Sequence, residues 1–445
     1  MESRNLLRLF DLTMIVIGLI IGMGIFRTAT DSAEAAISPA LYYGAWVAGG
    51  IIALCGAITY AEIGSRLPVT GCYYKVFAEC YHPSVAFAIN CIILISNASS
   101  LAAIALIGSE YLSQILFPLP PPDFVKALIA MAAIGAFYFV NLAGLRMSAG
   151  TQNVLMLIKL AMLLALILAV FKGTGVPHAA SSVNTSYSFL DYLRSFGMAL
   201  AAVSFTYGGY QHSINFGGDV AEPRRNIPRG ICIGIVAVII LYLLAQVSYV
   251  TVIGFEELKT AKGIAAIVAE KAYGETGRFI FSLLLFLAVL AYVNVQLLSN
   301  PRVMFAMSRD GILPAAFSRT SRERGVITVS LTAFTAATIM VLFFANTFEK
   351  ILGFTVFLDS IGMATSAATI FILRRRARGQ DSSGIFIMRL YPLMPLIFIA
   401  AYLFIGITIA VNTPMMAVTG IGAFLAFLAL YFAVFRGRPH PSLRT

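Results

Sequence analysis

Apolar runs of about 20 residues recur along almost the whole chain and constrain its fold more than any other feature. Only 11% of the 445 residues are charged and 59% are hydrophobic, whereas soluble domains carry about 25% charged residues. A run of about 20 apolar residues can cross the hydrocarbon core of a bilayer as a helix. A membrane barrel would show short alternating segments instead. The sequence therefore predicts an all-α polytopic membrane protein.

Twelve such segments can be counted, and basic residues gather at every second connection between them. The segments lie approximately at 10–36, 41–64, 85–113, 124–143, 151–171, 190–221, 231–253, 278–307, 326–345, 350–373, 389–411 and 414–435. Basic residues mark the cytoplasmic loops of membrane proteins, and one cluster is Arg374–Arg378. We therefore expect twelve spans in the cell (inner) membrane with both termini cytoplasmic. The same rule explains the net charge of +11 without a nucleic-acid partner.

Three glycines, Gly18, Gly22 and Gly24, lie close together in the first segment, in the stretch I-G-L-I-I-G-M-G-I-F. Glycine weakens a helix by roughly 1 kcal/mol relative to alanine. The cluster indicates a place where the helix opens and exposes backbone N–H groups, which can bind a carboxylate. The alternative is close helix packing, because Gly18 and Gly22 also have G-x-x-x-G spacing.

A second glycine-interrupted segment follows half a chain later, at 205–219 (F-T-Y-G-G-Y-Q-H-S-I-N-F-G-G-D). Paired interruptions in corresponding positions of two halves point to the binding site of a transporter. If spans 1–5 and 6–10 are two repeats, the odd number of crossings inverts the second relative to the first. We therefore expect a 5+5 inverted-repeat fold with broken helices 1 and 6. The first repeat would occupy 1–172, the second 173–378, and two peripheral helices with a cytoplasmic C-terminus 379–445.

Two connections are expected to hold short helices. The segment 60–82 is too polar to span, so we predict an inner loop with an interfacial helix whose tyrosines face lipid headgroups. The connection 255–277 is also long and polar, and its glycine and alanine content suits short helices over an outer vestibule.

Two charged residues, Lys159 and Asp359, fall inside apolar segments. A charge at the bilayer centre costs at least about 2.5 kcal/mol and is by default a functional hypothesis. Lys159 can exchange protons, it can snorkel towards the interface, or it can bond the free carbonyls of the opened first span and fill the space of a sodium ion. Asp359 can contact a substrate ammonium or hydroxyl, carry a proton, pair with another buried group, or lie nearer the outer face.

Other polar and aromatic residues in the spans are weaker candidates. Asn97 and Asn294 can join helices or line a site, and Phe205 and Tyr207 flank the second glycine interruption, where an aromatic side chain can act as a gate. The cysteines and histidines lack metal-ligand or disulfide spacing, so we expect no metal and no cofactor. Enzyme motifs such as G-x-S-x-G, a P-loop or H-E-x-x-H are missing, and we predict that the chain is not an enzyme.

Four motifs follow one another in an order that is typical of one superfamily. They are I-G-M-G-I-F in the first span, Y-A-E-I-G from Tyr60 with Pro68 and Gly71 after it, F-T-Y-G-G-Y from Phe205 with E-P-R-R-N-I-P from Glu222, and S-R-D-G-I-L-P from Ser308. Over about residues 10–435, the chain resembles the amino acid–polyamine–organocation (APC) superfamily, and within it bacterial relatives of the L-type amino acid transporters. The resemblance implies a sodium-independent secondary transporter that moves amino acids by alternating access, as an exchanger or a proton-coupled carrier. We expect no obligatory protein partner.

The resemblance also implies where a substrate binds. Gly22, Met23 and Gly24 would hold its carboxylate through backbone amides, and the backbone from Phe205 onwards would accept from its ammonium, with Phe205 as the gate. Lys159 matches a lysine that, in sodium-independent members, stands where sodium-coupled relatives bind sodium. The residues assigned to the site are Ile21, Gly22, Met23, Gly24, Ile25, Phe205, Thr206, Tyr207, Gly208, Asp359 and Asn294, with Lys159 as the substitute for sodium.

Two residues depart from the family motifs, and the first of them puts the identity of the substrate in doubt. Met23 replaces the usual serine beside the carboxylate, and Cys72 replaces the second glycine of the loop motif. Asp359 stands where relatives often have an uncharged residue. This difference allows either a proton-linked substrate or a substrate that bears an amine. The competing hypothesis is an amino acid-sensing membrane protein, a transceptor, without net transport.

Overall fold

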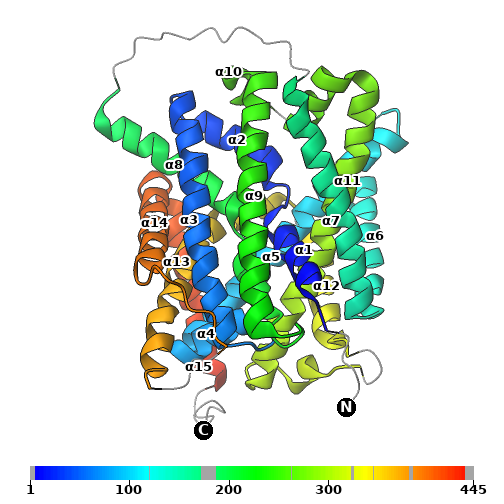
Figure 1. The fold of residues 1–445 in the computed structure, drawn as a ribbon. Helices are drawn as coiled ribbons and strands as arrows, with labels where there is room; N and C mark the ends of the chain where they lie inside the picture. The colour runs from blue at the N-terminus through cyan, green and yellow to red at the C-terminus, as the bar shows by residue number, and fades with distance from the viewer. Residues whose placement is uncertain are drawn as a thin grey trace.

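The computed structural model describes residues 6–119, 121–171, 187–261, 263–321, 325–343, 345–379 and 384–435, without the side chains of 345–356 and 435. Within these ranges, long helices run roughly side by side, and the two ends of the described chain lie at the same end of the bundle (Figure 1). Contacts of β type in the described ranges are two isolated bridges, Leu7 with Val220 and Thr70 with Phe216. The prediction of an all-α membrane protein is therefore confirmed.

The helices follow one another with short connections in the described part of the chain. Their bounds are α1 (Leu9–Ile20), α2 (Gly24–Ala35), α3 (Pro39–Arg66), α4 (Cys72–Cys80), α5 (Pro83–Leu116), α6 (Asp123–Leu142), α7 (Leu145–Leu168), η1 (Ala169–Phe171), α8 (Phe189–Tyr207), η2 (Tyr210–Asn215), α9 (Pro223–Ile253), α10 (Phe255–Leu258), α11 (Ile264–Arg309), η3 (Ala315–Ser318), α12 (Thr328–Leu342), α13 (Ala345–Arg376), α14 (Leu393–Asn412) and α15 (Pro414–Phe435).

Ten segments of the described chain are long and apolar enough to cross a membrane. Each coincides with one of the twelve predicted spans, within a few residues at most ends. The other two predicted spans, 190–221 and 326–345, form shorter helices. The first of them is divided between α8 and η2, and the second is the 15-residue helix α12.

Proline marks the first residue of α3, α5, α9 and α15. The first turn of a helix leaves its N–H groups without partners, so a residue that lacks an N–H is tolerated there. At the start of α3, Ser38 adds a side-chain cap that accepts from the Leu41 N–H. These local signals explain where the helices begin, within two residues of the predicted start for α3, α5 and α15, whereas α9 begins at Pro223, before the predicted start at 231.

The two predicted polar connections contain the expected short helices. α10 lies in the connection 255–277, and Gly274 interrupts α11 with a φ of 71°. The helix α4 lies in the segment 60–82, but its tyrosines do not face lipid. Tyr73 and Tyr74 are 1% and 0% exposed, because α4 packs inward against α5, α13 and η2. The prediction of an interfacial helix with tyrosines facing headgroups is therefore wrong.

The centre of the bundle holds the chain segments that contain the two glycine clusters. α1 packs against α7, α9 and η2, whereas α2 packs against α8. The long helices α3, α5, α7, α9 and α11 surround this centre. The fold thus brings together, deep in the molecule, two stretches that lie about half a chain apart.

Candidate functional site

The first helix pair is interrupted in the middle of the bundle. α1 ends at Ile20, α2 begins at Gly24, and residues 21–23 between them leave the helical path. The interruption predicted from the glycine cluster is therefore present. Gly18 has a different role, since it lies inside α1, where a Cβ atom would come within 2.3 Å of Gln152 Nε2. The packing alternative thus holds for Gly18, and the break begins only after Ile20.

The second interruption separates α8 from η2 at Gly208 and Gly209. Gly209 has a φ of 111°, and a Cβ atom at this position would lie 2.2 Å from the carbonyl oxygen of Leu19. Only glycine suits both this backbone conformation and this close approach. On the other side, a Cβ atom on Gly24 would lie 3.1 Å from Thr206 Oγ1. The two interruptions therefore pack directly against each other.

Backbone groups of opposite polarity are left without partners where the interruptions meet. The N–H groups of Met23, Gly24 and Ile25 have no hydrogen-bond acceptor among the described residues, whereas the Phe26 N–H donates to Met23 O at 3.1 Å. They lie at the N-terminus of α2, where the helix dipole favours an anion. The Thr206 carbonyl, at the C-terminus of α8, is also unpaired within the described structure, and a helix C-terminus favours a cation.

Two side chains donate hydrogen bonds to backbone carbonyl groups on the α1 side of the first break. Lys159, from α7, donates from Nζ to Ile21 O at 2.7 Å, and the Tyr242 hydroxyl, from α9, donates to Ile20 O at 3.2 Å. Lys159 is 1% exposed, and no described carboxylate pairs with it. The expectation that this ammonium bonds the free carbonyls of the opened span is confirmed. Its role as a substitute for sodium stays a prediction.

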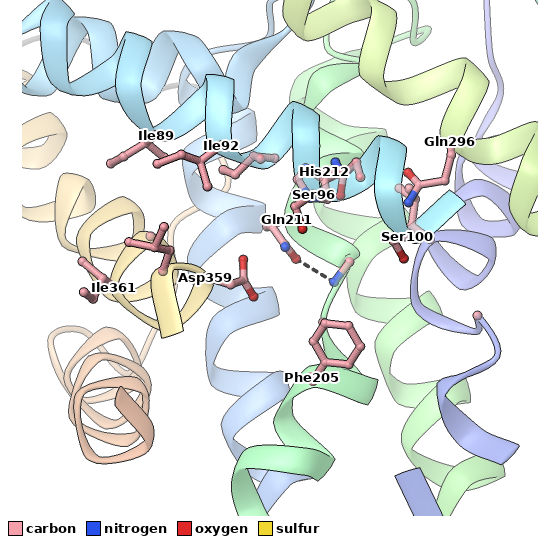
Figure 2. A pocket seen from close by; sticks show the side chains of 18 of the residues that line it. Ile89, Ile92, Ser96, Ser100, Phe205, Gln211, His212, Gln296, Asp359 and Ile361 are labelled. Carbon is pink, nitrogen blue, oxygen red and sulfur yellow. Dashed lines mark hydrogen bonds between the residues drawn. The ribbon is translucent and has the colours of Figure 1, made fainter. Parts of the chain in front are cut away.

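A cavity of about 460 Å³ lies beside the two interruptions (Figure 2), a volume typical of small-molecule sites. Helices α5, α11, α13 and α15 complete its walls, mostly with apolar side chains. Figure 2 shows Phe205 from α8 and Asp359 from α13 projecting into the same space. The predicted site residues that line the cavity are Gly22, Met23, Gly24, Phe205, Thr206, Gly208 and Asp359.

Other predicted residues lie outside this lining. Asn294 donates to Ser148 O at 3.0 Å and to Gln152 Oε1 at 2.9 Å, and it accepts from Asn141 at 3.0 Å. Its amide therefore joins α11 to α6 and α7, and we remove it from the site. The Tyr207 ring packs among buried aromatic side chains behind the break. The predicted residues absent from the cavity lining are Ile21, Ile25, Tyr207, Asn294 and Lys159.

The cavity also has polar lining residues that the sequence did not reveal. The hydroxyl groups of Ser100 and Tyr292 lie 3.1 Å apart, and Gln296 Nε2 donates to the Tyr292 hydroxyl at 2.6 Å. Tyr292 and Gln296 are four residues apart, as are Ser96 and Ser100, so each pair lies on one helix face. Such polar pairs in apolar helices are a signal that could have located this wall. The missed polar residues are Tyr81, Ser96, Ser100, Gln211, His212, Tyr292, Gln296 and Thr365.

A family model described as amino acid permease matches residues 7–435. This chain belongs to the amino acid permease family. The matched range contains both helix interruptions and every residue of the cavity lining. Membership of the permease family confirms the resemblance that the four sequence motifs indicated.

Relatives of the permease align with it over nearly its whole length. It is 26% identical over 410 residues to the serine/threonine exchanger SteT of Bacillus subtilis, which covers 91% of each chain. It is 26% identical over 431 residues to the large neutral amino acids transporter small subunit 2 of Homo sapiens, covering 94% of the permease and 78% of that chain. It is 25% identical over 423 residues to the Asc-type amino acid transporter 1 of Mus musculus, covering 94% and 79%.

Proposed function

We propose that the permease is a sodium-independent amino acid exchanger that works by alternating access. The observation that carries this proposal is the meeting of the two interrupted helices beside the cavity, with unpaired N–H groups on one and an unpaired carbonyl on the other. Every α-amino acid carries a carboxylate and an ammonium on one carbon atom. A helix N-terminus facing a helix C-terminus matches that common part. The names of the relatives support amino acid exchange and transport.

In this proposal, backbone groups hold the part of the substrate that all amino acids share. The Gly22 N–H, which the sequence assigned to the carboxylate, donates to Ile20 O at 2.8 Å instead. The N–H groups of Met23, Gly24 and Ile25 therefore bind the carboxylate, and the backbone around Thr206 accepts from the ammonium. Phe205 lines the cavity next to that backbone and is 48% exposed, which suits an aromatic gate over the bound substrate. Because this recognition uses backbone atoms, the replacement of serine by Met23 changes the space beside the carboxylate and leaves its N–H donors in place.

Lys159 is the basis for proposing sodium independence. Its ammonium donates to Ile21 O at 2.7 Å, at the opened part of the first span. A fixed positive charge at this carbonyl repels a sodium ion and satisfies the oxygen that the ion would need. We therefore assign Lys159 the place of a sodium ion.

The architecture that accompanies this function is a pair of inverted repeats. Ten candidate spans, the divided segment α8–η2 and the short helix α12 together make twelve crossings. The first repeat would occupy 1–172 and the second 173–378, followed by two peripheral helices in 379–445. The two described chain ends share one end of the bundle, in keeping with cytoplasmic termini in the cell membrane.

The test is uptake of a panel of labelled amino acids into proteoliposomes that contain the permease alone. Vesicles preloaded with unlabelled amino acids are compared with empty vesicles, in sodium-free buffer and again with an inward sodium gradient. We expect rapid uptake only into preloaded vesicles, with no stimulation by sodium. Sodium-driven uptake would contradict the role of Lys159. Uptake into empty vesicles that grows with an inward proton gradient would show symport instead of exchange, and no uptake of any amino acid would reject the proposed function.

A further inference from the structure

Asp359 is set apart by its charge among the residues that line the cavity. It is the only Asp, Glu, Lys or Arg in the described lining. Its carboxylate forms no hydrogen bond and no ion pair with any described residue. A carboxylate withdrawn from water is costly unless it is paired or protonated. The cavity therefore contains one carboxyl group whose charge, when it is ionised, no described residue neutralises.

Other carboxylates that this fold withdraws from solvent have cationic partners. Glu62 lies 2.6 Å from an Arg374 nitrogen, Asp219 lies 2.8 Å from an Arg302 nitrogen, and Asp310 forms an ion pair with a lysine. These pairs show how the chain normally compensates a buried acid. Asp359 departs from that pattern, and it lines the cavity beside the two interruptions.

The side chains around Asp359 provide no positive charge of their own. Four tyrosines, from α3, α4, η2 and α14, lie near its carboxyl group, and His212 lines the same cavity from η2. The hydroxyl groups of Tyr73 and Tyr210 are buried and have no partner in the described structure. The four tyrosines are Tyr60, Tyr73, Tyr210 and Tyr402. A cation beside Asp359 must therefore come from the ligand.

The wall next to Asp359 is apolar. Figure 2 shows Ile89 and Ile92 on α5 facing the space into which Asp359 projects, and Ile361, two residues after Asp359 on α13, also lines the cavity. A substrate side chain that extends towards Asp359 can contact these hydrocarbon groups of the lining. An aliphatic stem with a positively charged tip fits such a wall, because the stem replaces water and the tip meets the carboxylate.

We propose that Asp359 is the specificity-determining residue of the permease and selects amino acids whose aliphatic side chain ends in a cationic nitrogen. This inference rests on the proposed function, since the backbone at the two interruptions must hold the α-carboxylate and α-ammonium. The second positive charge of the substrate then pairs with Asp359 across the cavity.

The experiment compares two amino acids that differ only in the charged tip. L-Lysine and L-norleucine have the same four-carbon stem, and only lysine ends in an ammonium. Exchange of each is measured in proteoliposomes with the wild-type permease, Asp359→Asn and Asp359→Glu. We expect the wild type to prefer lysine by about tenfold or more, Asp359→Asn to lose that preference while it still exchanges norleucine, and Asp359→Glu to retain it.

Several outcomes would overturn the inference. A wild type that exchanges norleucine as well as lysine would show that no cationic tip is recognised. A lysine preference that survives in Asp359→Asn would place the recognition elsewhere. If Asp359→Asn changes only the pH dependence and leaves the substrate ranking unaltered, the residue carries a proton and does not select the substrate. Exchange of neutral amino acids without lysine rejects this inference alone, whereas no exchange of any amino acid rejects the proposed function as well.

Discussion

Lys159 illustrates how one buried side chain can stabilise an opened helix. Its ammonium and the Tyr242 hydroxyl each donate to one carbonyl of the first break, Ile21 O and Ile20 O respectively. Lipid cannot supply these bonds. The two donors differ in charge, so replacing them one at a time separates the effect of a hydrogen bond from the effect of a positive charge.

We predict that Lys159→Met lowers exchange in proteoliposomes by roughly tenfold to a hundredfold. The reason is that a hydrogen bond from a charged donor contributes about 1.5–3 kcal/mol. Tyr242→Phe is the matched control, because it removes a neutral donor from the adjacent carbonyl and should cost less. Both variants are first checked for a monodisperse gel-filtration profile. Wild-type exchange in Lys159→Met, or an equal loss in Tyr242→Phe, would exclude a special role for the ammonium.

Phe205 allows a second test at the scale of a single residue. We expect Phe205→Ala to reduce amino acid exchange by about tenfold or more, because the lost contact between the ring and the bound substrate is worth about 1.5–3 kcal/mol. Phe189→Ala is the control, since this phenylalanine lies at the other end of α8 and is 79% exposed. The kinetics of labelled uptake are the measurement. If Phe205→Ala takes up amino acids with unchanged kinetics, Phe205 is not the gate.

At the scale of elements, the site depends on the close approach of two interrupted helices. Gly209 and Gly24 are the contact points, the first against Leu19 O and the second against Thr206. The approach leaves the N-terminus of α2 and the C-terminus of α8 beside the same cavity. Any side chain at the first contact would push the two breaks apart and disturb both ends of the substrate site together.

Gly209→Ala is predicted to lower the melting temperature of the purified permease and to impair exchange. A strained backbone conformation costs about 1–3 kcal/mol, and the added Cβ atom would lie 2.2 Å from Leu19 O. Gly44→Ala, inside α3, is the control because a Cβ atom there meets nothing within 4 Å. If Gly209→Ala has the melting temperature and the exchange rate of the wild type, the tight contact between the breaks is not required for stability or for exchange.

At the scale of the whole molecule, one buried carboxylate joins distant parts of the chain. Glu62 on α3 is 0% exposed, and it accepts hydrogen bonds from Arg66, Arg374 and the Met388 N–H. The Arg374 guanidinium also lies 3.8 Å from the centre of the Tyr391 ring. The cluster ties α3 to α13 and to the segment before α14, so any motion that separates these elements must break it.

Glu62→Gln should therefore destabilise the permease more than the loss of an exposed ion pair. Removing one partner of a buried pair costs about 3–5 kcal/mol, whereas exposed pairs contribute about 0–1 kcal/mol. Asp123→Asn provides the comparison, since the Asp123 side chain is 98% exposed in its pair with Lys126. Thermal melting of both variants in detergent is the measurement. Equal melting temperatures for the two variants would show that the Glu62 cluster does not hold the helices together.

Much of the fold was predictable because its signals are local. Hydropathy located the ten long spans, and the glycine clusters located both interruptions, since a glycine weakens a helix wherever it occurs. The expected contact of Lys159 with the open span followed from the cost of burying a charge. The tyrosines of α4 were misplaced for the opposite reason. Amphipathic composition does not reveal that Tyr73 and Tyr74 face inward against other helices.

The sequence by itself determined the membrane class, the approximate spans and the two broken helices, because each depends on residues close together in the chain. Only the tertiary structure decided which polar side chains face the cavity. It engaged Asn294 in bonds to α6 and α7, and it brought Gln296 and Gln211 into the lining. It also left Asp359 without a partner among the described residues. Which buried polar groups form hydrogen bonds with one another depends on how helices distant in sequence pack. A local sequence pattern does not contain this information.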